Sequence, residues 1–350
     1  MGLIVNKYCW KSIQIQYWCC IIGVIYESGH KWRFDETKKH CPKCGSSEVK
    51  KNGRSRHEKQ RWICSVCGRT YGWKNTAIKY VRQKIWFKRW ITEGYTLRQL
   101  SLQSGYSRYQ VGQIINHWLP RVPHQVPSFS ESRYVLFDGT GFEKRRGIFS
   151  LMQAPQYQIL YSAYGLSEGP RDLFQFCQFL ADQGLRPISA TVDGNPHLIR
   201  ILQTLWPRIL IQRCLVHIQR QGLMWCRRNP KRTDAKHLRE IFLQVMSIRS
   251  FQQRDAFLEQ IQDWEGHYGQ TMASTPPSGW VFSDLKRARN MLLTALPDMF
   301  HYLQDTHIPT STNALEGYFS RLKQRYRQHR GLSKHKRKDY FQWYTYLCPK

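Results

Sequence analysis

The chain has 350 residues, which is enough for one large domain or for two or three smaller ones with separate cores. It carries 54 lysines and arginines against 24 aspartates and glutamates, a formal net charge of +30 that is spread over its whole length. Nucleic acid is the expected partner, because a strongly positive field attracts polyanions. An anionic membrane surface is disfavoured, since no basic amphipathic helix stands out. A basic protein that is merely soluble remains the alternative.

Cysteine usage and apolar runs indicate where the protein works. Of the eleven cysteines, four fall in two Cys-x-x-Cys pairs, which indicates a reducing compartment and a metal site rather than a disulfide scaffold. The longest apolar run, residues 17–26, has about half the length that a bilayer requires. No clean signal-peptide cleavage site follows it. We expect a cytoplasmic protein without a membrane partner, with residues 1–36 as an N-terminal extension of unknown role.

Residues 37–75 are predicted to form a zinc ribbon. Two Cys-x-x-Cys-Gly knuckles, at residues 41–45 and 64–68, are separated by enough chain for a β-hairpin. Zinc takes four thiolates in a tetrahedron, and four cysteines leave no open position, so the predicted role of the zinc is structural. Basic residues of this segment either contact phosphates or form an ordinary solvated face. The predicted ligands are Cys41, Cys44, Cys64 and Cys67.

A helix-turn-helix module is predicted at residues 76–121. Leu97 and Leu100 are expected in the core of its first helix, Gly105 allows the turn, and Ser107 caps the second helix. The apolar residues of the second helix share one face, which leaves side chains that can read base edges on the other. These candidates for DNA binding are Arg108, Tyr109, Gln110 and Gln113. An all-α packing module without a DNA role is the alternative, because helical hairpins are common.

A proline-containing linker leads into residues 132–350, where strands and helices alternate. The expected strands are 134–137, 147–154, 157–164, 188–192 and 208–211, and the expected helices are 170–183 and 196–205. Three strands followed by helix, strand, helix and strand are the order of an RNase H-like α/β sheet. The helical stretch at about 218–305 is then an α-helical insertion ahead of a last, catalytic helix.

Three carboxylates of this region are candidates for catalysis. Asp138 and Asp193 each follow a buried strand, and in an RNase H-like sheet those two strands are neighbours. Glu316 lies in the first turns of a helix capped by Thr312 or Asn313. Phosphodiester cleavage and strand transfer use two metal ions, and Mg²⁺ prefers carboxylate ligands. Taken singly, each aspartate is also typical of a turn, and Glu316 of a capping box.

Four blocks of residues resemble the signature blocks of bacterial DDE transposases of the Mutator-like insertion-sequence group. Their order and separation also match, and the resemblance extends over about residues 37–347. It implies an RNase H-like core, a helical insertion, and Mg²⁺-dependent transposition with Asp138, Asp193 and Glu316 as the metal-binding triad. The blocks are residues 138–140 (Asp-Gly-Thr), 192–194 (Val-Asp-Gly), 214–217 (Cys-Leu-Val-His) and 312–317 (Thr-Asn-Ala-Leu-Glu-Gly).

In that group a Cys-x-x-His follows the second carboxylate, here Cys214 and His217. His217 is accordingly a candidate catalytic residue that positions the DNA or supports the site. A packed helix turn is the alternative, and a second zinc site lacks a matching pair. Beyond Glu316 the chain is rich in cations, which we expect to hold the DNA backbone beside the metals. The first of them are Arg321, Lys323 and Arg325.

The sequence therefore predicts a nucleoid-associated DNA transposase with structural zinc and two Mg²⁺ ions, for which Mn²⁺ can substitute. Its partner is double-stranded DNA, at the element ends and at the target, and synapsis of two ends requires a homodimer or higher multimer. Two rivals remain: a catalytically silent, transposase-derived DNA-binding regulator, and an RNase H-like nuclease that does not transpose. The retained triad argues against the first, and inverted repeats beside the gene would argue against the second.

Overall fold

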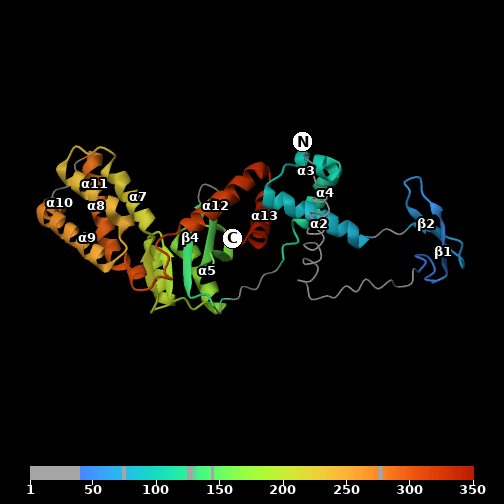
Figure 1. The fold of residues 1–350 in the computed structure, drawn as a ribbon, viewed down its shortest axis with the longest axis horizontal. Coiled ribbons are helices and arrows are strands. Elements are labelled where there is room, and N and C mark those ends of the chain that lie inside the picture. Colours follow the sequence, from blue (N-terminus) through green and yellow to red (C-terminus); the bar gives the residue numbers. More distant parts are fainter. Residues whose placement is uncertain (1–39, 73–75, 124–128, 130, 143–145, 275–278) are drawn as a thin grey trace, which may run out of the picture. The chain divides into compact units, whose positions relative to one another are not determined.

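The computed structural model describes residues 40–350, apart from 73–75, 124–128, 130, 143–145 and 275–278 (Figure 1). The extension predicted at residues 1–36 lies outside the described residues, as does part of the linker. The chain divides into two compact units, Met1–Lys79 and Tyr80–Lys350. Among the helices of the described residues, none is both long and apolar enough to cross a bilayer.

The first unit holds a small antiparallel sheet. β1 (Val49–Arg54), β2 (Gln60–Cys64) and β3 (Thr70–Gly72) pair in that order. Trp62 and Cys64 are two residues apart on β2 and therefore face the same side of the sheet, and both are buried. The hairpin predicted between the two knuckles is therefore present, and it turns Cys64 towards the inside of this unit.

Three helices come next in the chain: α2 (Thr76–Glu93), α3 (Leu97–Ser104) and α4 (Arg108–Trp118). Ser107 caps α4 as predicted, and it does so in a capping box with Gln110. Leu100 is fully buried, but Leu97, also predicted in the core, is 41% exposed. Leu97 is the first residue of α3, and this end of the helix is open to solvent. The helix-turn-helix arrangement of α3 and α4 is otherwise as expected.

The following part of the chain forms a five-stranded mixed sheet. Its strands lie in the order β6-β5-β4-β7-β8, with β4, β5 and β6 antiparallel and with β7 and β8 parallel to β4. The predicted succession of strands and helices is confirmed. In chain order these are β4 (Tyr134–Gly141), β5 (Gly147–Ala154), β6 (Gln158–Leu166), α5 (Pro170–Asp182), β7 (Ser189–Val192), α6 (Pro196–Leu205) and β8 (Leu210–Arg213).

Helices cover both faces of this sheet. Val135 and Phe137 of β4 face one way, into a core with the apolar residues of α5 and α6. Leu136 faces the other way, into a core with α12 (Asn313–Tyr326) and α13 (Lys334–Leu347). Because successive side chains of a strand alternate between its faces, every second residue of β4 points towards the side of α12.

Between β8 and α12 the chain is helical and has a core of its own. Buried Gln212 of β8 ties this segment to the sheet, since its side chain donates to the Met299 carbonyl at 2.8 Å and accepts the Tyr302 N–H at 3.3 Å. The elements are α7 (Leu215–Cys226), α8 (Thr233–Gln244), η1 (Val245–Ser247), α9 (Phe251–Trp264), η2 (Glu265–Gly269), α10 (Gln270–Ser274), α11 (Gly279–Ala295), η3 (Leu296–Asp298) and η4 (His301–Leu303).

The helix-turn-helix shares one core with α12 and α13. Phe87 of α2 packs edge-on against Trp343 of α13, with ring centroids 4.9 Å apart. The Trp343 indole N–H donates to the Leu119 carbonyl at 3.0 Å, and the Tyr340 hydroxyl donates to the Ile91 carbonyl at 3.1 Å. The helices at the start of the second unit and those at the end of the chain therefore form one packed body, which the sequence did not predict.

Candidate active site and cysteine cluster

Asp138 stands on the face of the sheet that α12 covers. It comes two residues after Leu136, so its side chain points to the same side. The prediction that the strand ends here is wrong: β4 continues to Gly141 through its antiparallel pairing with β5, while its parallel pairing with β7 stops at Leu136. Asp138 accepts the N–H of Gly139 at 2.8 Å.

Asp193 follows the last residue of β7, the strand beside β4. It accepts the Asn195 N–H at 3.0 Å, and the Asn195 side chain in turn caps α6 by accepting the His197 N–H at 2.9 Å. Between them Gly194 has a φ of 111°. A Cβ on Gly194 would lie 2.7 Å from Nε of Arg213, a buried side chain whose Nε lacks a hydrogen-bond partner in the described part of the chain. The Arg213 guanidinium thus packs against the loop that carries Asp193.

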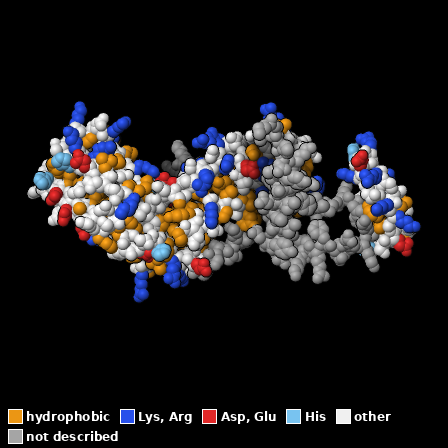
Figure 2. Space-filling model, in the orientation of Figure 1, with side chains coloured by type: hydrophobic (Ala, Val, Ile, Leu, Met, Phe, Trp, Pro, Cys, Tyr) orange, Lys and Arg blue, Asp and Glu red, His pale blue; other side chains and the backbone are white. Residues whose placement is uncertain are grey.

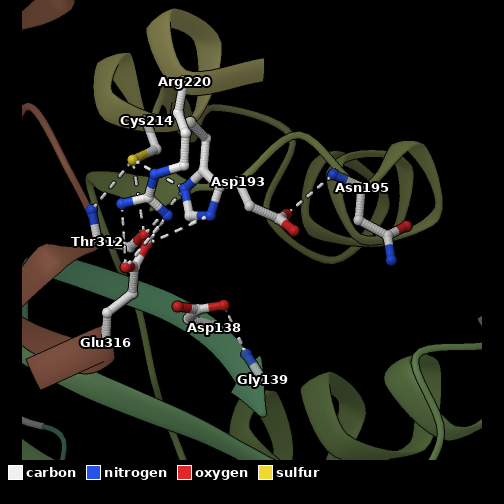
Figure 3. A network of polar contacts seen from close by, with 9 residues as sticks. Asp138, Gly139, Asp193, Asn195, Cys214, Arg220, Thr312 and Glu316 are labelled. Atoms are coloured by element: carbon white, nitrogen blue, oxygen red, sulfur yellow. Dashed lines mark hydrogen bonds and ion pairs between the residues drawn. The ribbon is translucent and has the colours of Figure 1, made fainter. Parts of the chain in front are cut away.

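Glu316 projects from α12 towards α7 (Figure 3). Its Oε1 lies 3.3 Å from Nε2 of His217, and its Oε2 lies 3.4 Å from Nη2 of Arg220. His217 and Arg220 are three residues apart on α7 and therefore share a face of that helix. Thr312, the N-cap residue of α12, makes no side-chain capping bond, so the capping-box alternative for Glu316 is wrong.

Cys214 contacts the ring of His217 on the side opposite Glu316. The ring Nδ1 lies 3.1 Å from the buried Sγ of Cys214, and the Thr312 N–H donates to the same sulfur at 3.3 Å. The Leu215 N–H donates to the Thr310 carbonyl at 3.0 Å. The start of α7 is thereby bonded to the loop before α12, and His217 lies between Cys214 and Glu316.

Burial, neighbouring charges and a hydrogen bond shift the pKa values of two groups in the site. Burial is the main cause that raises the pKa of Asp138 to about 7, and the charges of Asp193 and Glu316 raise it further. The hydrogen bond with Cys214 is the main cause that raises the pKa of His217 to about 9, against the effect of burial. Protonation of His217 is therefore favoured, and the positive charge of this ring in turn lowers the pKa of Asp138 in part.

The donor set fits a hard divalent cation. Carboxylate oxygens are the ligands that Mg²⁺ prefers, and a bound cation would offset the burial and the neighbouring carboxylates that raise the pKa of Asp138. A fourth acid lies close by: an oxygen of Glu168, from the turn before α5, is 2.9 Å from the position of a Cβ on Gly139. Partial burial and then the charge of Asp193 raise the pKa of Glu168. The site is thus more acidic than three carboxylates alone.

Sequence reasoning missed Glu168, Arg213 and Arg220. Arg220 had a usable signal, since it stands three residues after His217 on a predicted helix. Arg213 reaches the Asp193 loop only because β8 pairs with β7. Glu168 reaches the Asp193 loop from the turn between β6 and α5. The main-chain carbonyl of Glu168 accepts a hydrogen bond from the Asn195 side chain at 3.4 Å. No spacing of nearby residues in the sequence predicts the contact of Arg213 or of Glu168.

The predicted DNA-binding residues of α4 lie at the surface. Arg108, Tyr109 and Gln113 are exposed, and the exposed fraction of Tyr109 reaches 75%. Gln110 is exposed as well, but its Oε1 accepts the Ser107 N–H at 2.9 Å within the capping box. Contact between Gln110 and a base would therefore compete with the cap of its own helix.

The three predicted cations of α12 differ in their surroundings. Arg321 is exposed to solvent. The Nζ of Lys323 lies 5.5 Å from the ring centroid of Phe142. Arg325 donates to the Glu93 carbonyl at 3.4 Å and so joins α12 to the end of α2. Arg325 thus has a structural role in addition to the one predicted.

The four cysteines of the ribbon come together as predicted. The sulfurs of Cys41 and Cys67 are 3.5 Å apart, those of Cys44 and Cys64 are 3.6 Å apart, and all four lie within 4.8 Å of one another. Thiolates around a tetrahedral zinc are separated by about 3.8 Å, so the cluster can hold zinc. Within the described residues, no other group of three or more His, Cys, Asp or Glu ligands is gathered so closely.

A family model described as "Transposase, Mutator family" matches residues 156–335, which is 180 of the 350 residues. The chain belongs to the Mutator family of transposases. The search of curated proteins gave no match. The region matched by the Mutator family contains Asp193, His217 and Glu316, and Asp138 lies before it. The predicted resemblance is confirmed, and a transposase of this family acts on DNA.

Proposed function

We propose that this Mutator-family transposase is a DDE enzyme with an RNase H-like core, whose catalytic triad is Asp138, Asp193 and Glu316. The observation that carries the proposal is that these carboxylates lie in one region on the same side of the sheet, on β4, directly after β7 and on α12. The strand order β6-β5-β4-β7-β8, with three antiparallel strands followed by two parallel ones, supports the RNase H-like assignment.

In this proposal the triad holds two Mg²⁺ ions, for which Mn²⁺ can substitute. When bound, the ions stabilise the attacking and leaving oxygens of strand cleavage and strand transfer. His217 acts through Glu316 as a positioning residue, because its Nε2 contacts that carboxylate while Cys214 holds its Nδ1. Water and a DNA 3′-hydroxyl are the nucleophiles, so the chain needs to supply none.

DNA is proposed to follow the positive surface of the protein. Figure 2 shows lysine and arginine side chains scattered over the visible face of the described residues, with fewer acidic side chains. The exposed side chains of α4 would contact bases, and those of α12 would contact phosphates near the metals. The ribbon adds further exposed cations, among them Lys50, Lys51, Arg54, Arg56, Lys59 and Arg61.

The proposed organisation follows from these roles. Residues 37–75 form a ribbon stabilised by zinc, 76–121 the end-binding module, and 132–350 the catalytic domain with its helical insertion at about 218–305. The transposase works in the cytoplasm on nucleoid DNA, as a homodimer or higher multimer, because two element ends must be joined in one complex.

The decisive experiment measures strand cleavage and joining on DNA that carries the element's own ends, with Mg²⁺. We expect Asp193→Asn to reduce the rate by at least roughly a thousandfold, because it removes a charge that holds the metal ions. Asp263→Asn is the matched control, since Asp263 is an exposed aspartate of α9 outside the site. It should leave the rate unchanged.

Two outcomes would point elsewhere. Tight, end-specific binding without products from the wild type would favour a catalytically silent regulator. Cleavage without joining, on DNA that lacks inverted repeats, would favour an RNase H-like nuclease.

A further inference from the structure

Both carboxylate oxygens of Glu316 are contacted by side chains of α7, the guanidinium of Arg220 and the ring of His217. Nη1 of Arg220 lies 3.5 Å from Oε1 and 3.4 Å from Oε2, and its Nη2 lies 3.4 Å from Oε2. Nε2 of His217 lies 3.3 Å from Oε1. Figure 3 shows the guanidinium of Arg220 facing the carboxylate of Glu316.

This arrangement conflicts with the proposed role of Glu316 as a metal ligand. A carboxylate has about four lone-pair sites, and the contacts from α7 use most of them. A divalent ion and a guanidinium that are drawn to the same carboxylate also repel each other. Arg220 must therefore give up at least part of its contact before Glu316 can serve a metal.

Arg220 is suited to make that exchange. Its side chain is 60% exposed, against 32% for Glu316, and an ion pair this exposed is weak. A guanidinium binds phosphate through two parallel hydrogen bonds, which is a stronger contact than the one it has here. DNA whose reacting phosphate enters the site brings further phosphates close to the face of α7 that carries Arg220.

We propose that Arg220 is a phosphate-binding residue that occupies Glu316 until DNA arrives. In the free protein it competes with the metal for Glu316, and on DNA binding it moves to the backbone and releases the carboxylate. DNA and metal then bind cooperatively, each raising the affinity for the other by the same factor. This inference rests on the proposed DDE function, since it takes Glu316 as a metal ligand.

The test measures Mn²⁺ affinity by the loss of the free-ion EPR signal, on full-length protein whose ribbon is saturated with zinc. Each protein is titrated alone and with a pre-cut duplex of the element end. We expect Arg220→Gln to bind Mn²⁺ roughly tenfold more tightly than the wild type in the absence of DNA. The factor by which DNA raises the Mn²⁺ affinity should fall by a similar amount.

Two further variants separate the possible explanations. Arg220→Lys keeps a cation at this place and should retain most of the coupling. Arg287→Gln is the matched control, because Arg287 pairs with Asp284 at 3.5 Å and is 57% exposed, and it should behave as the wild type. In the presence of Mn²⁺, the slope of log Kd against log salt for DNA should fall by about one ion in Arg220→Gln and not in Arg287→Gln.

The results also separate this inference from the function on which it rests. If Asp193→Asn binds Mn²⁺ as the wild type does, the proposed metal site is wrong. If Asp193→Asn abolishes binding but Arg220→Gln shows wild-type affinity and coupling, the metal site stands and the exchange by Arg220 is wrong.

Discussion

The cysteine cluster and the acidic site are both groups of potential metal ligands, but they are built in opposite ways. The four sulfurs come from two turns of one small sheet, between Cys41 and Cys67, and are gathered within 4.8 Å of one another. The three carboxylates come from β4, from the loop after β7 and from α12, and the Glu316 oxygens are contacted by His217 and Arg220 of α7.

A site built from residues close together in the chain can be recognised from their spacing, whereas a site assembled from distant elements cannot. A cluster built from nearby turns can be predicted from sequence, and its loss can leave the rest of the protein folded. A site built from distant elements depends on the packing of the whole second unit, and its ligands can be held by other side chains.

Loss of zinc should unfold the ribbon and leave the second unit intact. Four thiolates contribute roughly 10 kcal/mol or more of binding free energy, which is far more than a three-stranded sheet of this size can supply by burial. We expect chelation, or Cys64→Ser, to abolish protease protection of residues 40–72 and to remove one zinc per chain. Cys348→Ala, which changes a cysteine outside the cluster, should alter neither. Cleavage that spreads into the five-stranded sheet would contradict the local character of this site.

Gly194→Ala should damage the acidic site through residues distant in the chain. A Cβ there would overlap the Arg213 guanidinium, and φ is 111°, so we expect a loss of about 2–4 kcal/mol in the free energy of unfolding. Gly184→Ala is the matched control, because Gly184 also has a positive φ, of 89°, but no atom within 4 Å of the added Cβ. Chemical denaturation should show the smaller loss in Gly184→Ala, and equal losses would exclude Arg213 as the cause.

His329 should make the shared core sensitive to acid. Burial lowers its pKa from 6.5 to about 4, although its Nε2 donates to the Trp90 carbonyl at 3.2 Å. The unfolded chain takes up a proton below pH 6.5 and the folded chain resists it, so stability is complete above pH 6.5 and is lost as the pH falls towards 4. The wild type should lose about 2 kcal/mol from this group between pH 7 and pH 5.

The measurement for His329 compares unfolding of the wild type and His329→Gln at both pH values. The rings of Trp90 and Tyr340 pack against His329, with centroids 4.5 and 5.1 Å from that of its ring. At pH 7 the substitution therefore lowers the free energy of unfolding through the loss of this packing. Its cost should shrink at pH 5, because glutamine does not titrate. A cost that is the same at both values would show that the pKa of His329 is not lowered in the fold.

Gln110 and Gln113 offer the smallest and most local test. Both are exposed on α4, but only Gln110 belongs to the capping box. Gln110→Ala should lower the free energy of unfolding by about 1 kcal/mol, and Gln113→Ala should leave it within about 0.5 kcal/mol. Gln113→Ala should instead change the preference among end sequences in a binding assay. The opposite pattern would move the base-reading role from Gln113 to Gln110.

Features of the fold that arise from nearby residues were predictable from the sequence. The cysteine knuckles, the Ser107 cap and the succession of strands and helices depend on patterns within a few residues, and the structure agrees with them. The neighbouring strands that carry Asp138 and Asp193 followed from the order of elements and a known sheet type. Glu316 needed the family resemblance as well, because its own surroundings suggested only a capping box.

The features that were missed depend on partners far away in the chain. β4 runs beyond Phe137 because β5 pairs with it there, and Arg213 lies over Gly194 because β8 lies beside β7. The shared core joins Phe87 to Trp343, and no spacing or periodicity marks such a pair. Each of these features depends on tertiary packing, which cannot be predicted from local patterns in a single sequence.

The shared core also constrains the order in which function appears during translation. A ribosome releases α2 about 240 residues before α13. Until α13 emerges, Phe87 and Trp90 lack the aromatic rings of Trp343 and Tyr340 that cover them. A nascent chain therefore completes its helix-turn-helix only after Glu316 has been made. Interrupted synthesis is therefore expected to yield fragments in which Phe87 and Trp90 stay uncovered and this helical module is not enclosed.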